Sequence, residues 1–443
     1  MGVFFGTDGL RGEIGNDLNH EIAYNCGNAL GKLFTNSNIL LGKDTRISGD
    51  YIATAFASGA ISSGSNVTYI GVCPTPGIAY LANSLNFDYA VAITASHNPM
   101  EHNGIKIFDN NYRKIADKKE ELLERNFFHR ITVPNSHLGH IFYKPHLIRK
   151  YKNFLLSNSN NFENLHIALD CANGATGRIA KYIFEKTGAK VSLINTENSG
   201  LNINKDCGAT STSHIQKLVT DTHADVGFAF DGDGDRVIAI DRDGIIIDGD
   251  QIIYILTKYY MKSNKLRTPA VVGTRHTNMG MELALNKLGV ELYRTDIGDK
   301  FVSSKLIENN LQIGGEQSGH IILRDLLPTG DGILTAITLC KIISEEKLTL
   351  KDLCDYTPSK QCNKSVKTNH KLNIINSEKL SSAINRYESK LRGKGRIMVR
   401  VSGTEPVIRI MVESDCDDTS QRIASNIESI IIEIDKEQYL CAE

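Results

Sequence analysis

The sequence has no surplus of basic residues, no paired cysteines and no long apolar run. Its 50 lysines and arginines are balanced by 51 aspartates and glutamates, so the formal net charge is −1. Proteins that bind nucleic acid over a broad surface need a basic surplus. The balanced charge therefore argues against a protein of this class, although a local basic pocket stays open. No segment is apolar over the length that crosses a bilayer. We therefore expect neither nucleic acid nor a membrane as a partner.

The nine cysteines are scattered along the chain, and none has the CxxC spacing of a zinc or redox motif. Isolated thiols are typical of a reducing compartment. The first residues, "MGVFFGTDGLRG", also lack the basic segment and apolar run of a secretory signal. The sequence therefore predicts a cytoplasmic protein.

Strand and helix patterns alternate through most of the chain. Apolar runs at 38–44 and 66–72 predict strands, and the segment 48–64 has helical spacing with Ser48 placed to cap it. The alternation restarts at 165–195 and at 269–274, which favours parallel sheets with helices on both faces. The last stretch differs, because 396–414 predicts two strands around a turn and 420–434 an amphipathic helix.

The predicted fold class is therefore α/β, with three similar α/β units of mixed, mostly parallel sheets and a C-terminal α+β domain. We place the domains at residues 1–155, 156–252, 253–366 and 367–443. Each α/β unit ends a strand in a loop rich in Gly, Ser or Asp, and ligands of open α/β sheets bind at the carboxyl ends of strands. We expect these loops to face one central cleft, which the fourth domain closes.

The segment "FAFDGDGDRVIAID" (228–241) places three aspartates at alternate positions after an apolar strand. This spacing points three carboxylates the same way, and three oxygen donors suit a hard cation such as Mg²⁺. An EF-hand is excluded, because Arg236 and Arg242 stand where its loop needs Gly and Glu. A solvated acidic turn is the alternative, but the apolar residues on both sides favour a buried metal site.

The segment "TASHNPMEHNGIKIF" (94–108) places Ser96 between a small residue and His97, which suits an exposed nucleophile. Such a hydroxyl needs a base or an adjacent electrophile. The alternative is a capping turn, because Ser and Asn before Pro99 commonly open helices. A Ser–His–Asp hydrolase is disfavoured, because this segment lacks the GxSxG elbow.

Two later loops also carry polar groups that suit a ligand. In "GGEQSGH" (314–320), Glu316 and Ser318 offer an acceptor and a hydroxyl to ligand hydroxyls, with a polar β-turn that holds a satisfied carboxylate as the alternative. In "RVSGTEPVIR" (400–409), two arginines flank a turn with hydroxyls and open backbone amides, which suits a phosphate. A hairpin turn with two surface arginines explains that second loop equally well.

Taken in this order, the loops resemble those of the α-D-phosphohexomutase superfamily over essentially the entire chain. "FGTDGLRG" (5–12) is similar to its N-terminal motif, "TASHNP" to its phosphoserine loop and "DGDGDR" to its metal loop. "GEQSGH" is similar to its sugar loop and "RVSGTEP" to its phosphate loop. The resemblance implies four domains around a cleft and an enzyme that interconverts glucosamine 6-phosphate and glucosamine 1-phosphate. A mutase for mannose or glucose phosphates of the same superfamily is the alternative, and a non-catalytic phosphosugar-binding module is a third.

The resemblance also implies roles for individual residues. Ser96 would carry a phosphoryl group, and one Mg²⁺ per chain would be held by Asp231, Asp233, Asp235 and an oxygen of the phosphoserine. A hexosamine 1,6-bisphosphate would be the intermediate and, in catalytic amounts, the activator. The resemblance places Arg11 and His97 beside the reacting phosphate, Arg236 beside the metal loop, and Lys106 as the acid or base. Glu316 and Ser318 would bind the ring hydroxyls, with His320 as a support of their loop. The second phosphate would be bound by Arg400, Ser402, Gly403, Thr404 and Arg409.

One segment departs from the family pattern. "GDKFV" (298–302) stands where the family often has GDRYV, so that Lys300 replaces an arginine and Phe301 a tyrosine. A bidentate contact to substrate at that position would be weakened. The expected partner is a phosphosugar, and a homodimer stays open.

Overall fold

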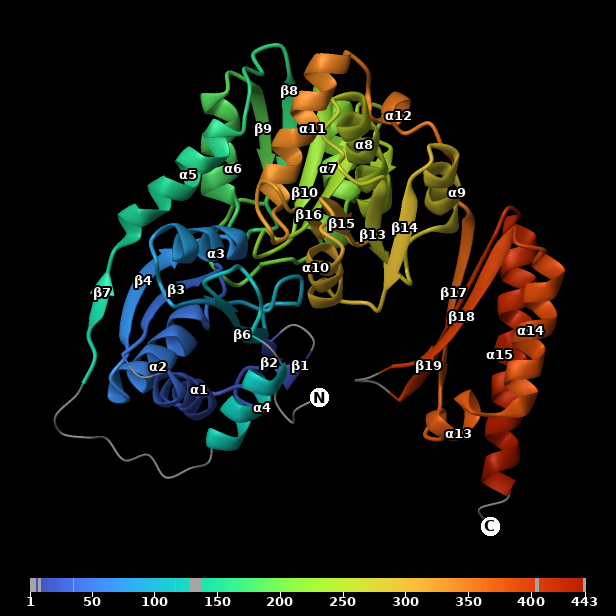
Figure 1. Ribbon diagram of the computed structural model, residues 1–443, viewed down its shortest axis with the longest axis horizontal. Helices are drawn as coiled ribbons and strands as arrows, with labels where there is room; N and C mark the ends of the chain where they lie inside the picture. Colours follow the sequence, from blue (N-terminus) through green and yellow to red (C-terminus); the bar gives the residue numbers. More distant parts are fainter. Residues whose placement is uncertain are drawn as a thin grey trace. The chain divides into compact units, whose positions relative to one another are not determined.

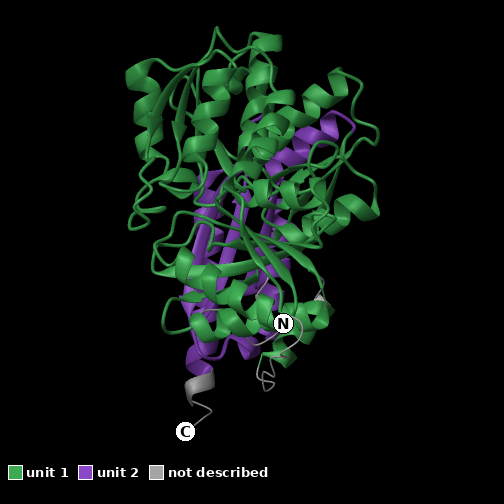
Figure 2. Cartoon of the chain, turned by 90° about the vertical axis from the view of Figure 1, so that its left-hand side faces the viewer, with its two compact units in different colours: residues 1–276, 290–355 green, residues 277–289, 356–443 purple. Residues whose placement is uncertain are grey.

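A computed structural model of the chain describes residues 5–6, 9–34, 36–115, 117–127, 138–402 and 406–440. They fall into two compact units (Figure 2). The first consists of residues 1–276 and 290–355, and the second of residues 277–289 and 356–443.

The N-terminal sheet of the first unit has seven strands in the order β1-β2-β6-β5-β3-β4-β7. They are β1 (Phe5–Gly6), β2 (Gly9–Glu13), β3 (Asn38–Lys43), β4 (Asn66–Val72), β5 (Tyr89–Ile93), β6 (His102–Asp109) and β7 (Ile141–Tyr143). The pairs β5–β3, β3–β4 and β4–β7 are parallel, whereas the pairs β5–β6, β6–β2 and β2–β1 are antiparallel. The sheet is therefore mixed, with a parallel part and an antiparallel part that meet at β5.

Helices cover both faces of this sheet, as Figure 1 shows for α3 on one side and α1 and α2 on the other. The helices are α1 (His20–Leu33), α2 (Gly49–Ser62), α3 (Thr75–Ser84), α4 (Asp117–Asn126), η1 (Pro145–Leu147) and α5 (Ile148–Ser157). Helices α1 and α2 approach closely, because a Cβ on Gly59 would lie 1.9 Å from the carbonyl oxygen of Tyr24. Leu30 and Phe56 of this pair are fully buried in the core beneath the sheet.

The second sheet has the order β12-β11-β10-β8-β9. Its strands are β8 (His166–Asp170), β9 (Lys190–Ile194), β10 (Val226–Phe230), β11 (Val237–Asp241) and β12 (Ile246–Ile247), and its helices are α6 (Gly177–Lys186), η2 (Gly208–Thr210) and α7 (Ser213–Thr222). Strand β10 is parallel to β8 but antiparallel to β11, with Phe230 opposite Val237. The six residues between these two partners therefore form a tight hairpin loop.

The third sheet has the order β14-β13-β15-β16. Its strands are β13 (Ala270–Thr274), β14 (Glu291–Thr295), β15 (Ile313–Gly315) and β16 (Ile321–Leu323), and the helices are α8 (Gly249–Lys262), α10 (Asp299–Glu308), α11 (Gly332–Glu346) and α12 (Leu350–Leu353). Strands β14, β13 and β15 are parallel, and β16 returns antiparallel to β15.

The second compact unit contains an antiparallel sheet in the order β17-β19-β18 with helices packed on it. Its elements are α9 (Met279–Lys287), β17 (Lys360–Lys367), α13 (Lys371–Ile375), α14 (Glu378–Leu391), β18 (Gly395–Val401), β19 (Val407–Ser414) and α15 (Asp417–Leu440). Ile408, Val412 and Ile427 are buried in its core.

The predicted fold class is confirmed, because three mixed α/β sheets precede a C-terminal antiparallel sheet with helices. The capping role of Ser48 is wrong. Its side chain makes no capping hydrogen bond to α2 and instead accepts one from Asn103 Nδ2 at 2.9 Å. The C-terminal helix is longer at both ends than the predicted 420–434. Among the described helices, none has the length and apolar character to span a bilayer.

Candidate functional site

Three hairpin loops of the first compact unit carry the polar residues singled out in the sequence. The loop 94–101 joins β5 to β6, the loop 231–236 joins β10 to β11, and the loop 316–320 joins β15 to β16. Each pair of strands is antiparallel. Side-chain contacts described below connect the first loop to the second and the second to the third, so the fold gathers all three.

Ser96 lies inside this cluster and not at the surface. Its side chain is fully buried, and its Oγ donates a hydrogen bond of 2.6 Å to Asp231 Oδ2. The expectation of an exposed nucleophile is therefore wrong. The capping-turn alternative is also wrong, because the loop leads into β6 and no helix begins after Pro99. His97 Nδ1 lies 3.4 Å from Ser96 Oγ.

Asp231, Asp233 and Asp235 are all buried, and one carboxylate oxygen of each lies within 4.8 Å of the others. Asp233 Oδ2 accepts hydrogen bonds from Thr75 Oγ1 at 2.6 Å and Lys106 Nζ at 2.9 Å. Lys106 Nζ also donates to Asp235 Oδ2 at 3.0 Å. These contacts exclude a solvated acidic turn.

The aspartate cluster is suited to a cation. Asp233 Oδ1 and Asp235 Oδ1 are buried and have no hydrogen-bond partner among the described residues. Buried oxygens without partners are costly unless something compensates them. Three converging carboxylates with two such oxygens form the kind of donor set that a hard divalent cation prefers. The residues present therefore fit a metal ion.

The pKa values within the cluster diverge. Burial and the charges of Asp235 and Asp233 raise the pKa of Asp231 well above its ordinary value. Burial alone would raise the pKa of Asp235 as well, but Lys106, His320 and Arg236 hold it well below the usual range. Burial opposes the charge of Lys106, yet the two neighbouring carboxylates raise its pKa. Lys106 is therefore an ammonium at neutral pH, and the lowered pKa that a lysine base needs is absent.

Further nitrogen groups surround the three carboxylates. Arg236 Nε lies 3.8 Å from Asp235 Oδ1, and its pKa is raised by the aspartates despite burial. Arg11 lies on β2 opposite Gly104, and burial lowers its pKa although Asp233 and Asp235 oppose the shift. Burial, with Arg236 and Arg11, lowers the pKa of His97 to about 4, so this ring is neutral at pH 7. A site with this charge distribution suits a phosphate group.

The loop 316–320 is packed closely against neighbouring elements. Glu316 is buried, and its Oε1 accepts a hydrogen bond of 3.1 Å from the backbone N–H of Gly298. Gly319 has a φ of +93°, and a Cβ there would lie 2.2 Å from the carbonyl oxygen of Val237. Ser318 is exposed, so its hydroxyl is open to a ligand. A polar turn with a satisfied carboxylate, the alternative considered from the sequence, agrees with this backbone and with the hydrogen bond to Glu316.

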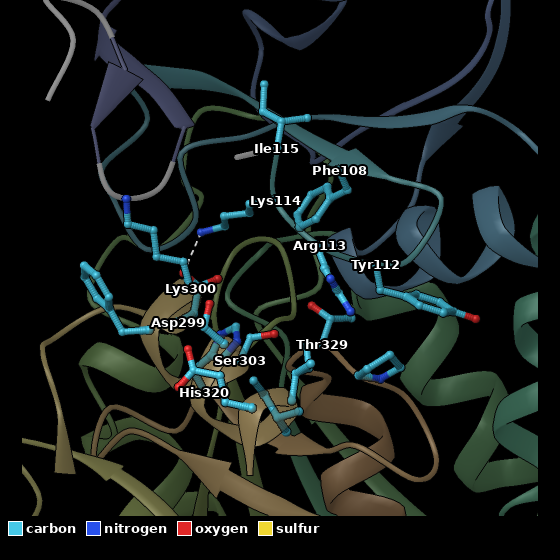
Figure 3. A pocket seen from close by; sticks show the side chains of 16 residues that line it. Phe108, Tyr112, Arg113, Lys114, Ile115, Asp299, Lys300, Ser303, His320 and Thr329 are labelled. Carbon is cyan, nitrogen blue, oxygen red and sulfur yellow. Dashed lines mark hydrogen bonds and ion pairs between the residues drawn. The ribbon is translucent and has the colours of Figure 1, made fainter. Parts of the chain in front are cut away.

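His320 connects the loop 316–320 to the loop 231–236. Its Nδ1 lies 3.8 Å from Asp235 Oδ2. Burial would lower the pKa of His320, but Asp235, Asp299 and Glu316 raise it. The same ring lines a cavity of about 460 Å³ (Figure 3).

That cavity lies between the segment 108–115 and one side of α10, along its whole length. Lys114 Nζ forms an ion pair of 2.7 Å with Asp299 Oδ1, which Figure 3 shows as a dashed line. Lys300 and Phe301, the two departures from the family pattern, also line it. Sequence analysis missed Lys114 and Asp299, because nothing in either segment signals a contact between residues so distant in the chain. It also missed Thr75, although the position of Thr75 just after the predicted strand 66–72 is a signal of the kind used for the other loops.

The predicted phosphate-binding residues belong to the second compact unit. Arg400 on β18 pairs directly with Arg409 on β19, and burial together with the charge of Arg409 lowers the pKa of Arg400. Two like charges on opposite strands repel, and an anion would offset that repulsion. Ser402 is buried, and its N–H donates to the carbonyl oxygen of Val407 at 2.9 Å. Gly403 and Thr404 lie outside the described residues.

Comparison with known proteins covers nearly the whole chain. Four family models match in chain order: phosphoglucomutase/phosphomannomutase, alpha/beta/alpha domain I over residues 2–132, domain II over 145–244, domain III over 248–360, and the C-terminal domain over 363–430. A phosphoglucosamine mutase of Carboxydothermus hydrogenoformans is 41% identical, with 97% of this chain and 99% of the relative covered. One of Buchnera aphidicola is also 41% identical, with 98% of both covered.

Solved structures share the fold at lower identity. A phosphoglucomutase/phosphomannomutase family protein of Burkholderia thailandensis superposes with a TM-score of 0.81 at 22% identity, over 97% of this chain and 96% of the other. An Aspergillus fumigatus N-acetylphosphoglucosamine mutase in complex with GlcNAc-6P and magnesium gives 0.70 at 16% identity, over 97% and 96%.

Proposed function

We propose, from the premise that this chain belongs to the phosphoglucomutase/phosphomannomutase family, that it interconverts glucosamine 6-phosphate and glucosamine 1-phosphate. It is an intramolecular phosphotransferase of the isomerase class. The relatives from Carboxydothermus and Buchnera, matched over nearly their full length, are named phosphoglucosamine mutase and support this choice among the hexose phosphates.

One contact carries the proposal. The hydrogen bond from Ser96 Oγ to Asp231 joins two loops that are 135 residues apart in the chain. It places a hydroxyl that can be phosphorylated against a buried cluster of three carboxylates. A phosphoryl group on Ser96 would bring further negative charge to this cluster, and a divalent cation held by Asp231, Asp233, Asp235 and the phosphoserine would offset it. Mg²⁺ is the ion we propose, and when bound it would stabilise the charge of the transferring phosphoryl group.

The protein groups then divide the remaining work. Ser96 gives its phosphoryl group to a sugar hydroxyl: the bond from phosphorus to Ser96 Oγ breaks and a bond to the sugar oxygen forms, which yields a hexosamine 1,6-bisphosphate. The other phosphate of this intermediate later returns to Ser96. We assign Arg11 and Arg236 to phosphoryl oxygens. Lys106, as an ammonium, would protonate the departing serine oxygen and, once neutral, accept the proton that the sugar hydroxyl loses, so that the step leaves no proton unaccounted for. His97, whose ring lies 3.4 Å from Ser96 Oγ, would hydrogen-bond to the phosphoryl group.

The sugar must bind in two orientations, because each phosphate reacts in turn. We propose that Glu316 and Ser318 bind ring hydroxyls in both, with His320 supporting their loop. The second phosphate is assigned to Arg400, Ser402, Gly403, Thr404 and Arg409. Catalytic amounts of the 1,6-bisphosphate would serve as activator by phosphorylating any enzyme that has lost its phosphoryl group.

Intact-mass analysis with peptide mapping, combined with a mutase assay, tests the proposal. We expect the active protein to carry one phosphoryl group on Ser96, and Ser96→Ala to lose both the added mass and the turnover. Ser318→Ala is the matched control, because it should keep the phosphoryl group and raise KM. Full turnover by Ser96→Ala would contradict the mechanism. A higher kcat/KM on mannose or glucose phosphates than on glucosamine phosphates would contradict the substrate.

The compartment is also proposed as cytoplasmic. All eight cysteines within the described residues are free thiols, and six of them are buried. Thiols in this state support a reducing environment.

A further inference from the structure

A buried arginine outside the predicted site uses every one of its side-chain donors near Ser96. Arg46 follows β3 and is fully buried. Its Nε donates to Asp44 Oδ2 at 2.9 Å. Its two terminal nitrogens donate to four backbone carbonyl oxygens of the Ser96 loop and its exit, those of Ser96, Asn98, Pro99 and His102. A guanidinium has five N–H donors, so this one is fully satisfied.

The loop needs such support because its backbone is strained. Ser96 has a φ of +52°, in the left-handed region that non-glycine residues rarely adopt. This conformation is energetically costly and persists only where the surroundings hold it. The carbonyl oxygen of Ser96 accepts from Arg46 Nη2 at 3.0 Å, so the guanidinium holds the strained residue directly.

The N–H of Ser96 is held by the same cluster. It donates to Thr94 Oγ1 at 2.9 Å, and Thr94 Oγ1 donates to Asp44 Oδ2 at 2.7 Å. Asp44 also accepts from the backbone N–H of Arg46 at its other oxygen. Both backbone polar groups of Ser96 are therefore tied to the Asp44–Arg46 pair, one directly and one through Thr94.

A second anchor comes from the domain that carries the aspartates. Asn204 Nδ2 donates to the carbonyl oxygen of Ser96 at 2.9 Å and to that of Asn98 at 3.0 Å. The metal loop itself passes close by, because a Cβ on Gly232 would lie 2.7 Å from the Ser96 carbonyl oxygen. The backbone of Ser96 is thus held by Arg46 and Thr94 from the N-terminal sheet and by Asn204 from the segment that also carries Asp231.

We propose that Arg46 is a positioning residue which, with Asp44, Thr94 and Asn204, fixes the backbone of Ser96 for phosphoryl transfer. The inference rests on the proposed role of Ser96 as the phosphoryl carrier. None of the Arg46 donors is left for substrate, so the arginine acts only through the loop. Its loss should displace Ser96 Oγ from Asp231, and a displacement of about 1 Å can cost on the order of 100-fold in rate.

The sharpest test compares two substitutions at Thr94. Thr94→Val removes the hydroxyl that links Ser96 N–H to Asp44 with almost no change in shape, whereas Thr94→Ser keeps it. We expect Thr94→Val to lower kcat by about 10- to 100-fold with KM for glucosamine 6-phosphate nearly unchanged. Thr94→Ser should restore kcat. The rate at which a hexose 1,6-bisphosphate phosphorylates the dephosphorylated enzyme, read by intact mass, should fall in parallel with kcat.

Two further variants extend the test. Arg46→Lys replaces a planar fork with a single ammonium of three donors, which cannot serve Asp44 and four carbonyl oxygens together. We expect a larger loss of kcat than for Thr94→Val. Asn204→Asp turns a donor into an acceptor that faces two carbonyl oxygens, and it should lower kcat without unfolding the chain. Arg267→Lys is the control, because Arg267 pairs with Asp325 at the surface and should leave kcat unchanged.

The outcomes separate the two proposals. Wild-type protein without phosphate on Ser96 and without turnover would refute the proposed function. An active, phosphorylated wild type whose Thr94→Val and Asn204→Asp variants keep the wild-type kcat would overturn the positioning role alone. A rise in KM at unchanged kcat would overturn it as well. If Arg46→Lys fails to fold, the Thr94 pair and Asn204→Asp still decide the question.

Discussion

The carboxyl group of Asp331 makes the stability of the first unit depend on pH in a direction opposite to that of an aspartate held in an ion pair, such as Asp299. Asp331 precedes α11 and is 2% exposed. Its Oδ1 accepts from the N–H of Leu334 at 3.0 Å, and its Oδ2 accepts from Tyr151 OH at 2.7 Å. Burial outweighs both hydrogen bonds and raises its pKa from 3.8 to about 6.

The size of the effect follows from this shift. The folded chain binds the Asp331 proton more tightly than the unfolded chain, so protonation favours folding. The contribution is complete below about pH 4 and is lost as the pH rises through about 6. A shift of about two pKa units corresponds to about 3 kcal/mol in total. On acidification from about pH 7.5 to about pH 5, the free energy of unfolding rises by only part of this total, because pH 5 is just one unit below the folded pKa. That part is between about 1 and 2 kcal/mol.

The assay is a double difference. The free energy of unfolding is measured by urea titration at these two pH values for the wild type and for Asp331→Asn, whose amide keeps the shape but does not titrate. All other groups contribute to both proteins and cancel. On acidification the wild type should gain between about 1 and 2 kcal/mol more than the variant. A double difference of zero, or a loss on acidification, would refute the reasoning.

The remaining predictions concern the loops and the close helix contact. Gly319→Ala adds a Cβ 2.2 Å from the carbonyl oxygen of Val237 and should displace Glu316, so KM for the sugar phosphate should rise in steady-state assays, and an unchanged KM would contradict the role given to this loop. Asp233→Asn removes a charged ligand from the proposed metal site, and both this change and chelation by EDTA should lower turnover by orders of magnitude, with added Mg²⁺ restoring only the chelated wild type. Activity that persists in EDTA would exclude the metal. Gly59→Ala places a Cβ 1.9 Å from Tyr24 O and should destabilise the α1–α2 packing by about 1–3 kcal/mol, seen as a lower melting temperature, while Gly15→Ala, with open space around it, reports only the cost of its own positive φ.

The fold class could be predicted because its signals are local. Alternating strand and helix periods identify α/β units, and the aspartates at alternate positions identify a loop with three carboxylates on one side. The periodicity of apolar residues does not show whether two neighbouring strands pair parallel or antiparallel. The antiparallel hairpins that carry all three loops, such as β10–β11 with Phe230 opposite Val237, depend on contacts across the sheet.

The site was predictable only where chemistry and sequence motif coincide. Ser96 and the three aspartates can be recognised in the sequence from their motifs. The burial of Ser96 depends on the packing of the β5–β6 hairpin against the loop 231–236, which the sequence does not show. The role of Arg46 could not be predicted from the sequence, because "KDTRIS" has the composition of an ordinary polar loop. Its importance comes from carbonyl oxygens more than 50 residues away, which only the folded chain brings to one guanidinium. The same holds for Lys114 and Asp299.

The β5–β6 hairpin limits how the length of this chain can vary. Lys106 on β6 pairs with Ala92 on β5, and Ser96 lies in the loop that joins these two strands. The lysine and the serine therefore belong to one hairpin. Side chains alternate between the faces of a strand, and a single residue inserted into β6 ahead of Lys106 would turn the ammonium to the far side. An equal insertion in the turn after Asp109 would leave it in place. Length changes that preserve the chemistry are therefore confined to segments beyond the ladder between Tyr89 and Asp109.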